Sequence, residues 1–557
     1  MGFRTPAARL AAVTVVVTVV ALYAATTALT SGTFVYPLDD PAIHLSVARR
    51  LVHDGTWGVV AGEFQSASSS PLWTLLLAPT QWVAEGAAGE LVPLALALAA
   101  ALVAVRVLGD DLAVLRPGPR RPVDAVAVVA VVVGLAFLPG LAFMGMEHTL
   151  HAALVLALAA AVEARWAGGG PRAADRVPVP RWAPVALAAA ATAARYETGG
   201  VVVALAVGLA VAGLGPWRDP DTPPAPARRR VGAVAALAAT AAAVVGGVGA
   251  VSLAFGQGLL PNSVVLKSVG DRGDTRRSPA AALERLVGDP LLVAFAVVAV
   301  AVLAATAVAR RRGRVVPGGA AFPAAVTLVA ILVHAELGAV EASLRYQGYL
   351  YGLGTWTVLR VLPLLPALAP RLAGLPAGAV VLLLVPAAAH QVEATLSAPR
   401  EAAITWEQRY QVARFLAEAY REAPIAISEL GYISLYHDGP LTDVYGLADH
   451  EVLEARLDGR ADAAFWRDLT ERRDVEVVVT YDFSLGGDVP PEWIRVAEWR
   501  SPDAYFEVTR FWAAAPEHTG PLIERLRAYE PELPPGVEVT YNDVAPLVAA
   551  TRMAEGG

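Results

Sequence analysis

Residues 10–30 read LAAVTVVVTVVALYAATTALT, an uncharged and mostly apolar run. About 20 such residues are needed to cross the hydrocarbon core of a membrane as an α-helix. The run follows Arg4 and Arg9, as in a signal peptide, but it is longer than the apolar part of one and no clear cleavage site follows it. We therefore expect an uncleaved first membrane span at Leu10–Thr30.

The composition of the whole chain also indicates a protein of the lipid bilayer. The 557 residues include 56% hydrophobic and 17% charged residues, with a mean hydropathy of +0.50, whereas soluble domains are about 25% charged. These values exclude a plain soluble enzyme and a disordered chain. A net charge of −7 without a basic stripe argues against nucleic acid as a partner. Cysteine is absent, which excludes disulfides, thiolate metal sites and cysteine nucleophiles.

Further apolar runs predict a polytopic α-helical membrane protein with about 11 transmembrane helices. After the first, the predicted spans are Leu91–Leu108, Val123–Phe143, Thr149–Ala164, Ala183–Ala194, Gly199–Leu214, Val231–Phe255, Leu291–Ala309, Ala320–Ala335, Tyr346–Leu368 and Leu375–Ala389. The apolar run Leu72–Val83 is too short to span, and Pro71 and Pro79 flank and interrupt it. We expect it to lie in the outer membrane interface, with Trp73 and Trp82 as anchors.

The distribution of charge divides the chain into two domains. Residues 1–392 carry 29 basic and 21 acidic residues, and residues 393–557 carry 15 basic and 30 acidic residues. The long apolar runs end at the same boundary, so we predict a membrane domain at 1–392 and an acidic, soluble α/β domain at 393–557. The predicted elements of the second domain are β-strands at Ile425–Ser428, Val475–Thr480, Ile494–Glu498 and Phe506–Trp512, and helical stretches at Trp406–Glu422 and Asp449–Arg473.

The arginines predict how the chain is threaded through the plasma membrane. With a cytoplasmic N-terminus and eleven spans, every arginine-rich segment falls inside, as the positive-inside rule expects. These segments are residues 116–121, 165–181, 218–230, 310–314 and Arg371. The same threading places the first loop, residues 31–90, and the domain 393–557 outside the cytoplasm.

Two adjacent carboxylates, Asp39 and Asp40, lie near the start of the first outer loop. Asp40 precedes Pro41, which suits a first helical turn, so Asp40 could cap a helix over Ile43–Asp54 while the other aspartate is only a surface charge. Carboxylates at a membrane edge are costly, however, and are commonly functional. One of them could act as a general base, or the pair could hold a divalent cation with His44 nearby.

Other polar residues lie in the predicted outer segments. Glu63 and Ser69 belong either to a flexible connector or to a surface that hydrogen-bonds a polar ligand. Glu147 is either an interfacial polar cap or a second carboxylate or metal ligand. Arg195 and Glu197 either pair with each other at a turn or contact a phosphate and a sugar hydroxyl.

Lys267 is the only lysine among 44 basic residues, and Asn262 is one of two asparagines. A chain that otherwise uses arginine retains a lysine where a compact, strongly hydrated charge is wanted, and phosphate binding is such a use. Arg345 and Tyr346 lie at another outer helix end and could join this site. Alone, an arginine there is usually a snorkelling anchor.

These residues occur in short motifs that follow one another through most of the chain. The motifs are Leu38–Arg49 (LDDPAIHLSVAR), Ser69–Leu77 (SSPLWTLLL), Gly145–Glu147, Leu260–Lys267, Arg345–Tyr346, Gly431–Tyr436 and Leu441–Asp449. The ordered set resembles the GT-C superfamily of polyprenyl-phosphate-dependent glycosyltransferases, and within it the cell-wall arabinofuranosyltransferases that add terminal arabinose. The chain departs from the family pattern at Ala42-Ile43, at Tyr196 and at His148.

The resemblance implies a sugar donor of the polyprenyl-phosphate type, loaded from the membrane on the outer side, and a glycan, lipid or protein acceptor in the cell envelope. It implies that Asp39 or Asp40 is the base of an inverting transfer. The only cofactor to consider is a divalent cation, with Asp39, Asp40 and His44 as its ligands. The residues expected to contact donor or acceptor are His44, Glu63, Ser69, Glu147, Arg195, Glu197, Asn262, Lys267, Arg345 and Tyr346.

Two other functions would also suit a polytopic membrane protein. A transporter or flippase of envelope lipids should show internal repeats and ionisable residues within its spans, whereas this chain shows no repeat and its charges lie at helix ends. A non-catalytic scaffold with a soluble sensor tail predicts nothing particular about Asp39 and Asp40. The sequence therefore favours a membrane glycosyltransferase.

Overall fold

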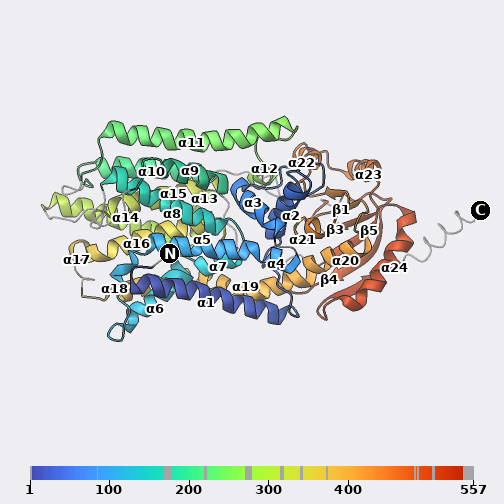
Figure 1. Ribbon diagram of the computed structural model, residues 1–557, viewed down its shortest axis with the longest axis horizontal. Helices are drawn as coiled ribbons and strands as arrows, with labels where there is room; N and C mark the ends of the chain where they lie inside the picture. Colours follow the sequence, from blue (N-terminus) through green and yellow to red (C-terminus); the bar gives the residue numbers. More distant parts are fainter. Residues whose placement is uncertain are drawn as a thin grey trace, which may run out of the picture. The chain divides into compact units, whose positions relative to one another are not determined.

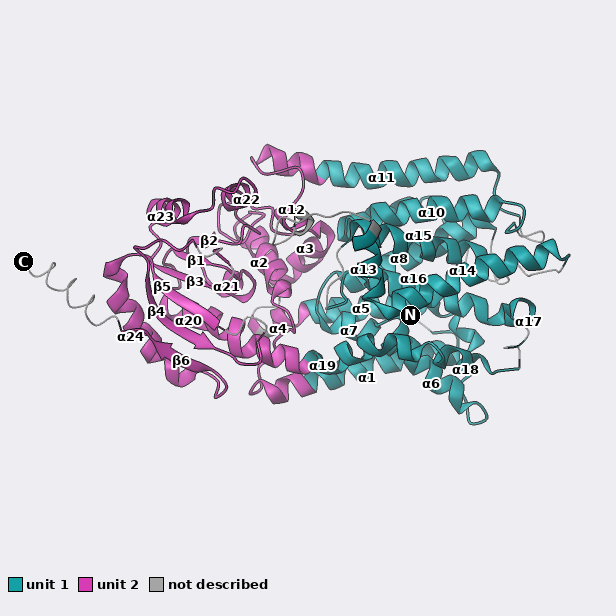
Figure 2. Ribbon diagram, turned by 180° about the vertical axis from the view of Figure 1, so that it is seen from behind, with its two compact units in different colours: residues 1–24, 93–247, 275–398 teal, residues 25–92, 248–274, 399–557 magenta. Residues whose placement is uncertain are grey.

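The computed structural model describes residues 3–83, 86–168, 179–218, 223–269, 279–313, 319–338, 343–369, 371, 374–481, 484–485, 488–504 and 508–543. Parts of three predicted arginine-rich segments (169–178, 219–222 and 314) lie outside the described residues, as do Phe506 of a predicted strand and the side chain of Lys267. The chain forms two compact units, which Figure 2 colours separately. Unit 1 comprises residues 1–24, 93–247 and 275–398, and unit 2 comprises residues 25–92, 248–274 and 399–557.

Unit 1 consists of apolar helices that run alongside one another (Figure 1). Among the described residues, five helices are long and apolar enough to cross a membrane: α1 (Pro6–Leu29), Ala88–Leu108 with α5 (Val92–Leu108), His148–Ala167 with α8 (His148–Val162) and the π-helix η4 (Glu163–Ala167), α11 (Ala227–Ala254) and α14 (Pro290–Arg311). Shorter helices are α6 (Pro122–Ala130), α9 (Ala183–Ala194), α10 (Thr198–Gly213), α13 (Pro279–Val287) and α15 (Ala321–Leu337). Several apolar helices of these lengths agree with a multi-pass membrane protein.

The last two predicted spans are interrupted helices. The first contains α16 (Gly348–Val361), η6 (Leu362–Leu364) and α17 (Leu365–Leu368), and the second contains α18 (Ala377–Leu382) and η8 (Val385–Ala388). Pro363, Pro366 and Pro386 lie at the interruptions. Proline interrupts a helix because it lacks a backbone N–H donor and clashes with the preceding turn. All eleven predicted segments contain helix, but the number of eleven spans stays a prediction.

The predicted span Val123–Phe143 is divided as well. Helix α6 continues as the π-helix η3 (Val131–Leu135), and α7 (Leu138–Phe143) begins after Phe137. Phe137 has a φ of 51°, in the left-handed region that a residue with a side chain seldom adopts. Its fully buried ring lies over Gly140, where an added Cβ would overlap the ring. The break thus coincides with Phe137, and Pro139 lies in the first turn of the helix that follows.

The carboxyl-terminal part of unit 2 contains a six-stranded mixed sheet with the order β2-β1-β3-β5-β4-β6. Strand β1 pairs in parallel with β2 and β3, whereas the pairs β3–β5, β5–β4 and β4–β6 are antiparallel. The four predicted strands are confirmed as β1, β3, β4 and β5, whereas β2 and β6 were not predicted. The strands are β1 (Ile425–Ile427), β2 (Leu441–Asp443), β3 (Val477–Thr480), β4 (Ile494–Arg500), β5 (Val508–Ala513) and β6 (Glu538–Tyr541).

Helices cover both faces of this sheet (Figure 1). They are α20 (Gln411–Ala419), α22 (His450–Leu457), α23 (Ala463–Arg472) and α24 (Thr519–Tyr529). On the face of α22 and α23, Trp466 and Val478 share one buried core. On the face of α20 and α24, Phe415 packs against Phe511 of β5 with ring centroids 5.7 Å apart. The predicted helical stretch Asp449–Arg473 is thus two helices.

Helix α19 (Ala389–Thr405) and the π-helix η9 (Trp406–Tyr410) lead into α20. Unit 2 also contains helices from the first loop and from the segment 248–274. These are α2 (Asp40–His53), α3 (Pro71–Leu77), η1 (Ala78–Trp82), α4 (Gly86–Glu90) and α12 (Asn262–Val269). The prediction that Trp73 is an interfacial anchor is wrong, because its side chain is packed inside the protein and is 1% exposed. Trp82 is 69% exposed, as an anchor should be.

Candidate active site

Helix α2 begins at Asp40, so the preceding residue, Asp39, holds the N-cap position. Asp39 has helical backbone angles (φ −87°, ψ −13°), and its side chain makes no capping hydrogen bond. Pro41 lies in the first turn, as predicted. The prediction that Asp40 caps this helix is wrong, because Asp40 is itself the first helical residue. The side chain of Asp39 is directed elsewhere.

The carboxylate of Asp39 lies against α21 (Gly431–Tyr436), which precedes β2 in unit 2. A Cβ added at Gly431 would overlap the Oδ2, Cβ and Cγ atoms of Asp39. The side chain of Asp39 hydrogen-bonds that of Glu429, and Arg409 Nη2 lies 3.4 Å from Glu429 Oε1. We call Asp39, Glu429 and Arg409 the Asp39 cluster.

The loop that carries Asp39 is fixed at two further points within unit 2. The backbone N–H of Tyr36 donates a hydrogen bond to the hydroxyl of Tyr432 at 3.0 Å. The hydroxyl of Thr405 donates to the carbonyl oxygen of Pro37, also at 3.0 Å. Because each bond involves a backbone atom of the loop, the two bonds fix the path of the main chain that leads to Asp39.

The electrostatic environment of the Asp39 cluster favours a proton on Glu429. Burial and the negative charge of Asp39 raise the pKa of Glu429 well above its usual range, against the opposing effect of Arg409. Asp40 acts in the same direction as Asp39. About a quarter of the Glu429 side chain, 24%, remains exposed. The cluster is therefore accessible to small polar groups while being largely desolvated.

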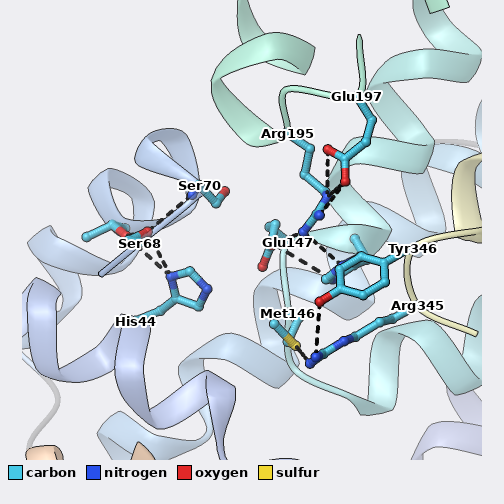
Figure 3. Close-up of polar contacts among 11 residues, drawn as sticks. His44, Ser68, Ser70, Met146, Glu147, Arg195, Glu197, Arg345 and Tyr346 are labelled. Atoms are coloured by element: carbon cyan, nitrogen blue, oxygen red, sulfur yellow. Dashed lines mark hydrogen bonds and ion pairs between the residues drawn. The ribbon is translucent and has the colours of Figure 1, made fainter. Parts of the chain in front are cut away.

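His44 lies on α2 but has hydroxyl partners from the α3 region (Figure 3). Its Nδ1 lies 3.2 Å from Ser68 Oγ and 3.5 Å from Thr74 Oγ1. Among the described residues, no group of three or more histidine, aspartate or glutamate side chains is arranged to hold a metal ion. The predicted cation ligands Asp39, Asp40 and His44 therefore do not fit a metal centre in this structure.

The other two predicted residues of the first loop lie near its surface. Glu63 is exposed and accepts a hydrogen bond from Gln65 Nε2 at 3.4 Å. Gln65 in turn accepts from the backbone N–H of Val59 at 2.9 Å, which closes a tight loop. Ser69 is half-buried just before α3. Glu63 is thus available to solvent, and Ser69 partly so.

Unit 1 contains a second polar cluster where α8, α9 and α10 end or begin (Figure 3). The guanidinium of Arg195 lies 2.6 Å from Glu147 Oε1 and 2.5 Å from Glu197 Oε1. It also donates to His148 Nε2 at 2.9 Å, and it lies 4.9 Å from the ring centroid of Tyr346. We call this group the Arg195 cluster. Arg195 therefore pairs internally, and with two carboxylates where the sequence suggested one.

Arg345 brings a second guanidinium to the same region of unit 1 (Figure 3). It donates to the hydroxyl of Tyr346 at 3.2 Å and to the sulfur of Met146 at 3.4 Å, and only 8% of the residue is exposed. Such burial is more than a snorkelling anchor needs. The predicted site residues that the structure brings together in unit 1 are Glu147, Arg195, Glu197, Arg345 and Tyr346.

Helix α12 carries the remaining predicted residues, Asn262 and Lys267, in unit 2. Asn262 is fully buried, and its backbone N–H donates to the carbonyl oxygen of Ser66 at 3.2 Å. Its Oδ1 lies 3.2 Å from Nδ1 of His450, the first residue of α22. The start of α12 is thus fixed to both the first loop and the sheet domain, and Lys267 follows within the same helix.

Glu429 and Arg409 were not predicted from the sequence as site residues. Both lie in the segment expected to be a separate soluble domain, and neither residue type is rare there. The nearest signal is the motif Gly431–Tyr436, which begins two residues after Glu429. The close approach of Asp39 explains why this motif begins with glycine.

The chain was compared with curated protein sequences, family models and solved structures. No curated protein sequence matches the chain. A family model described as "Domain of unknown function (DUF8728)" matches residues 402–517, which include Arg409 and Glu429. The apo crystal structure of the Archaeoglobus fulgidus oligosaccharyltransferase is 12% identical, with a TM-score of 0.44 over 93% of this chain and 78% of that one.

Two further solved structures are similar over most of the chain. The Archaeoglobus fulgidus oligosaccharyltransferase tethered with an acceptor peptide is 12% identical, with a TM-score of 0.41 over 94% of this chain and 75% of that one. ArnT from Cupriavidus metallidurans, bound to undecaprenyl phosphate, is 13% identical, with a TM-score of 0.47 over 91% of this chain and 99% of that one. At these values, a function has to be argued from the residues of the two clusters.

Proposed function

We propose that the protein is a membrane glycosyltransferase that moves a sugar from a polyprenyl-phosphate donor to a hydroxyl acceptor of the cell envelope, on the outer face of the plasma membrane. The observation that carries this proposal is the Asp39 cluster. Asp39 follows α1 closely, is largely buried, and neighbours a second acid without capping a helix. A carboxylate held in this way at a membrane edge suits the removal of a proton from a hydroxyl group.

The proposed reaction requires one base and one leaving group. A carboxylate oxygen of Asp39, or of Asp40, takes the proton of the acceptor hydroxyl while that oxygen bonds to the anomeric carbon of the sugar. The bond from the anomeric carbon to the phosphate oxygen breaks, and its electron pair leaves with polyprenyl phosphate. Attack opposite the phosphate inverts the anomeric carbon. Positioning of the reactants supplies much of the acceleration in such a reaction.

Lys267 and Arg345 are the residues proposed to bind the donor phosphate. Lys267 is the chain's only lysine and lies in a helix whose first residue is firmly anchored. Arg345 is held by Tyr346 and Met146, so little side-chain freedom is lost when it binds an anion. Each cation would form a charge-assisted hydrogen bond with phosphate oxygens.

The Arg195 cluster is proposed to bind the sugar. Two carboxylates already balance the charge of Arg195, which makes it a weaker phosphate ligand than Arg345. Glu147 and Glu197 can instead accept hydrogen bonds from sugar hydroxyls while Arg195 fixes their orientation. Because the motifs resemble those of arabinofuranosyltransferases, a polyprenyl-phosphoryl arabinofuranose is the first donor to test.

The test is incubation of the purified protein with a panel of polyprenyl-phosphoryl sugars and envelope acceptors, with polyprenyl phosphate and product measured by mass spectrometry. We expect acceptor-dependent release from a single donor type, and no release with Asp39→Asn. Movement of the intact donor across a vesicle membrane without release would favour a flippase. Neither release nor movement, with any donor, would favour a scaffold.

A binding measurement tests the donor site separately from turnover. Lys267→Ala should weaken donor binding by about 1.5–3 kcal/mol, the range for a hydrogen bond to a charged group. Lys267→Arg should restore only part of the affinity, because the guanidinium is planar and larger than the ammonium. Unchanged affinity in Lys267→Ala would remove this residue from the proposed site.

A further inference from the structure

We infer that Glu429 is a positioning residue for the base Asp39, so that the carboxyl-terminal part of unit 2 completes the active site. This inference rests on the proposed function, because it concerns the same base. Glu429 holds Asp39 through a carboxyl-to-carboxylate hydrogen bond, and Arg409 in turn holds Glu429. We call this carboxyl-terminal segment, residues 399–557, the tail. The tail then acts in catalysis through Asp39 without itself touching the reacting atoms.

The backbone at Gly431 supports this role. Gly431 has no positive φ, so its backbone conformation does not require glycine. An alanine Cβ at this position would instead overlap three atoms of Asp39. The lack of a side chain at Gly431 is therefore explained by the space that Asp39 occupies. The close approach of Asp39 is thus built into the tail backbone and does not depend on one side-chain rotamer.

The loop before Asp39 is presented to Glu429 in a fixed position. Tyr432, the residue after Gly431, accepts the hydrogen bond from the backbone of Tyr36, and Thr405 donates to the backbone at Pro37. These contacts come from the same carboxyl-terminal segment that supplies Glu429. Two backbone anchors immediately before a functional side chain help to place a base precisely.

The charges around Glu429 explain why Glu429 and Asp39 can lie side by side, with a proton on Glu429. The groups that act on Glu429 are Asp39, Arg409 and Asp40, and Glu429 in turn acts on Tyr481, at the start of the loop after β3. With all three carboxyls ionised, the single arginine would face three negative charges. A proton retained on Glu429 relieves this repulsion and supplies the donor of the hydrogen bond to Asp39.

The proton count of the proposed step is unchanged by this arrangement. The protonated carboxyl of Glu429 donates to one oxygen of Asp39, and the other oxygen of Asp39 takes the proton of the acceptor hydroxyl. The acceptor oxygen bonds to the anomeric carbon as polyprenyl phosphate leaves. After the products leave, Asp39 passes its new proton to water, and Glu429 keeps its own throughout.

Two substitutions at Glu429 test the hydrogen bond. Glu429→Ala should lower kcat about 100-fold with little change in donor KM, because the base loses its position. Glu429→Gln should stay within about tenfold of the wild type, because its amide N–H still donates to Asp39. Equal losses in the two variants, or wild-type activity in Glu429→Ala, would overturn the inference.

The chain offers a matched control for Glu429 on the same sheet domain. Glu498 of β4 is 25% exposed in its side chain and pairs with Arg495 at 3.0 Å and with Arg510 at 2.9 Å. Glu498→Gln should leave kcat and KM unchanged. A loss of kcat equal to that of Glu429→Ala would show that any glutamate–arginine pair of this domain affects activity. The positioning role of Glu429 would then be refuted.

The pH profile separates a positioning role from a structural one. The wild-type rate should decline as rising pH removes the proton of Glu429, since both acids are then charged. Glu429→Gln cannot lose a proton there, so its rate should lack this alkaline limb. An identical alkaline limb in the two proteins would contradict the inference.

A glycine variant tests the same contact without touching a charge. Gly431→Ala should displace Asp39 and reduce kcat, whereas Gly520→Ala, in α24 with open space around it, should not. Full activity in Gly431→Ala would show that the close approach of Asp39 has no role in catalysis.

A coupling measurement distinguishes failure of this inference from failure of the proposed function. If the wild type transfers no sugar, Asp39→Asn, Glu429→Gln and the double variant can still be compared by thermal unfolding. Strongly non-additive shifts in Tm would support the interaction, and additive shifts would refute it. If the wild type is active but Glu429→Ala is equally active, the proposed function stands and this inference fails.

Discussion

At the scale of single residues, the two adjacent aspartates have different surroundings. Asp39 is 8% exposed and packed against the tail backbone, whereas Asp40 is half-buried as the first residue of α2. Only Asp39 has both a second acid and a glycine that makes room for it. These surroundings make Asp39 the better candidate for the proposed base, a choice that the sequence left open.

Asparagine substitutions should separate the two roles. Asp39→Asn should abolish sugar transfer in a protein that still folds and binds donor, because the amide cannot accept the proton. Asp40→Asn should retain part of the activity and lose about 0.3–1 kcal/mol of stability, from the lost interaction of its charge with the helix dipole. Transfer assays, donor binding and thermal unfolding of both variants provide the check. Near-normal transfer in both would refute the mechanism.

Another buried acid, Asp443 of β2, makes the free energy of unfolding depend on pH. Burial raises its pKa to about 6, against the hydrogen bonds from the backbone N–H of Ala448 and Tyr445 at 2.7 Å and 2.8 Å. A raised pKa means that its contribution to stability is present at low pH and is lost as the pH rises towards about 6. Asp443→Asn does not titrate, so the stability of the variant relative to the wild type should increase over this range and level off above it. Unfolding measured from pH 4 to 8 tests the sign, and a difference that is constant with pH would contradict it.

At the scale of elements, the apolar segments are mostly predictable, but their continuity is not. The hydropathy of Val123–Phe143 indicates one span, yet the helix breaks at Phe137, which has left-handed backbone angles and is followed by Pro139 in the first turn of α7. In unit 2, short β-rich runs predicted β3 and β4. Strand β2 has three residues and depends on pairing with β1, so no periodic pattern reveals it.

Substitution of Gly140 should test the break between η3 and α7. Gly140→Ala places a methyl group in the ring of Phe137, which is fully buried and lies edge-on to Tyr351 at 6.1 Å, so the ring cannot move aside freely. Overpacking of this kind costs about 1–3 kcal/mol. Gly199→Ala is the control, because open space surrounds that position near the start of α10. Thermal unfolding in detergent should show a lower Tm only for Gly140→Ala, and equal Tm values would argue against tight packing here.

At the scale of the whole molecule, β-rich runs and helical stretches predicted the α/β fold of the carboxyl-terminal segment, but nothing predicted its contacts with the first loop. Asp39 and Glu429 are 390 positions apart in the sequence, and a single sequence contains no information that links residues so distant. The sequence motifs lie in or next to both regions, but they do not indicate that Asp39 and Glu429 are in contact. The contact depends on backbone anchors, such as that between Tyr36 and Tyr432, which only the three-dimensional structure reveals.

The orientation of the chain in the membrane can be measured directly. The arginine-rich segments predict a cytoplasmic N-terminus and a tail outside the cytoplasm. A reporter that is active only in the cytoplasm, fused after Gly557, should therefore be silent, and the same reporter inserted after Arg120 should be active. Strong cytoplasmic activity of the fusion at Gly557 would overturn the proposed orientation.

The three separate stretches of unit 2 also determine when the Asp39 cluster can form during biosynthesis. Tyr36 and its partner Tyr432 are separated by 396 residues. At about 5–20 residues per second, a ribosome needs roughly 20–80 seconds to reach the second residue after the first. During that interval the Asp39 loop has been synthesised but Glu429 and Arg409 do not yet exist. A chain that stalls in translation before Arg409 therefore cannot assemble the Asp39 cluster.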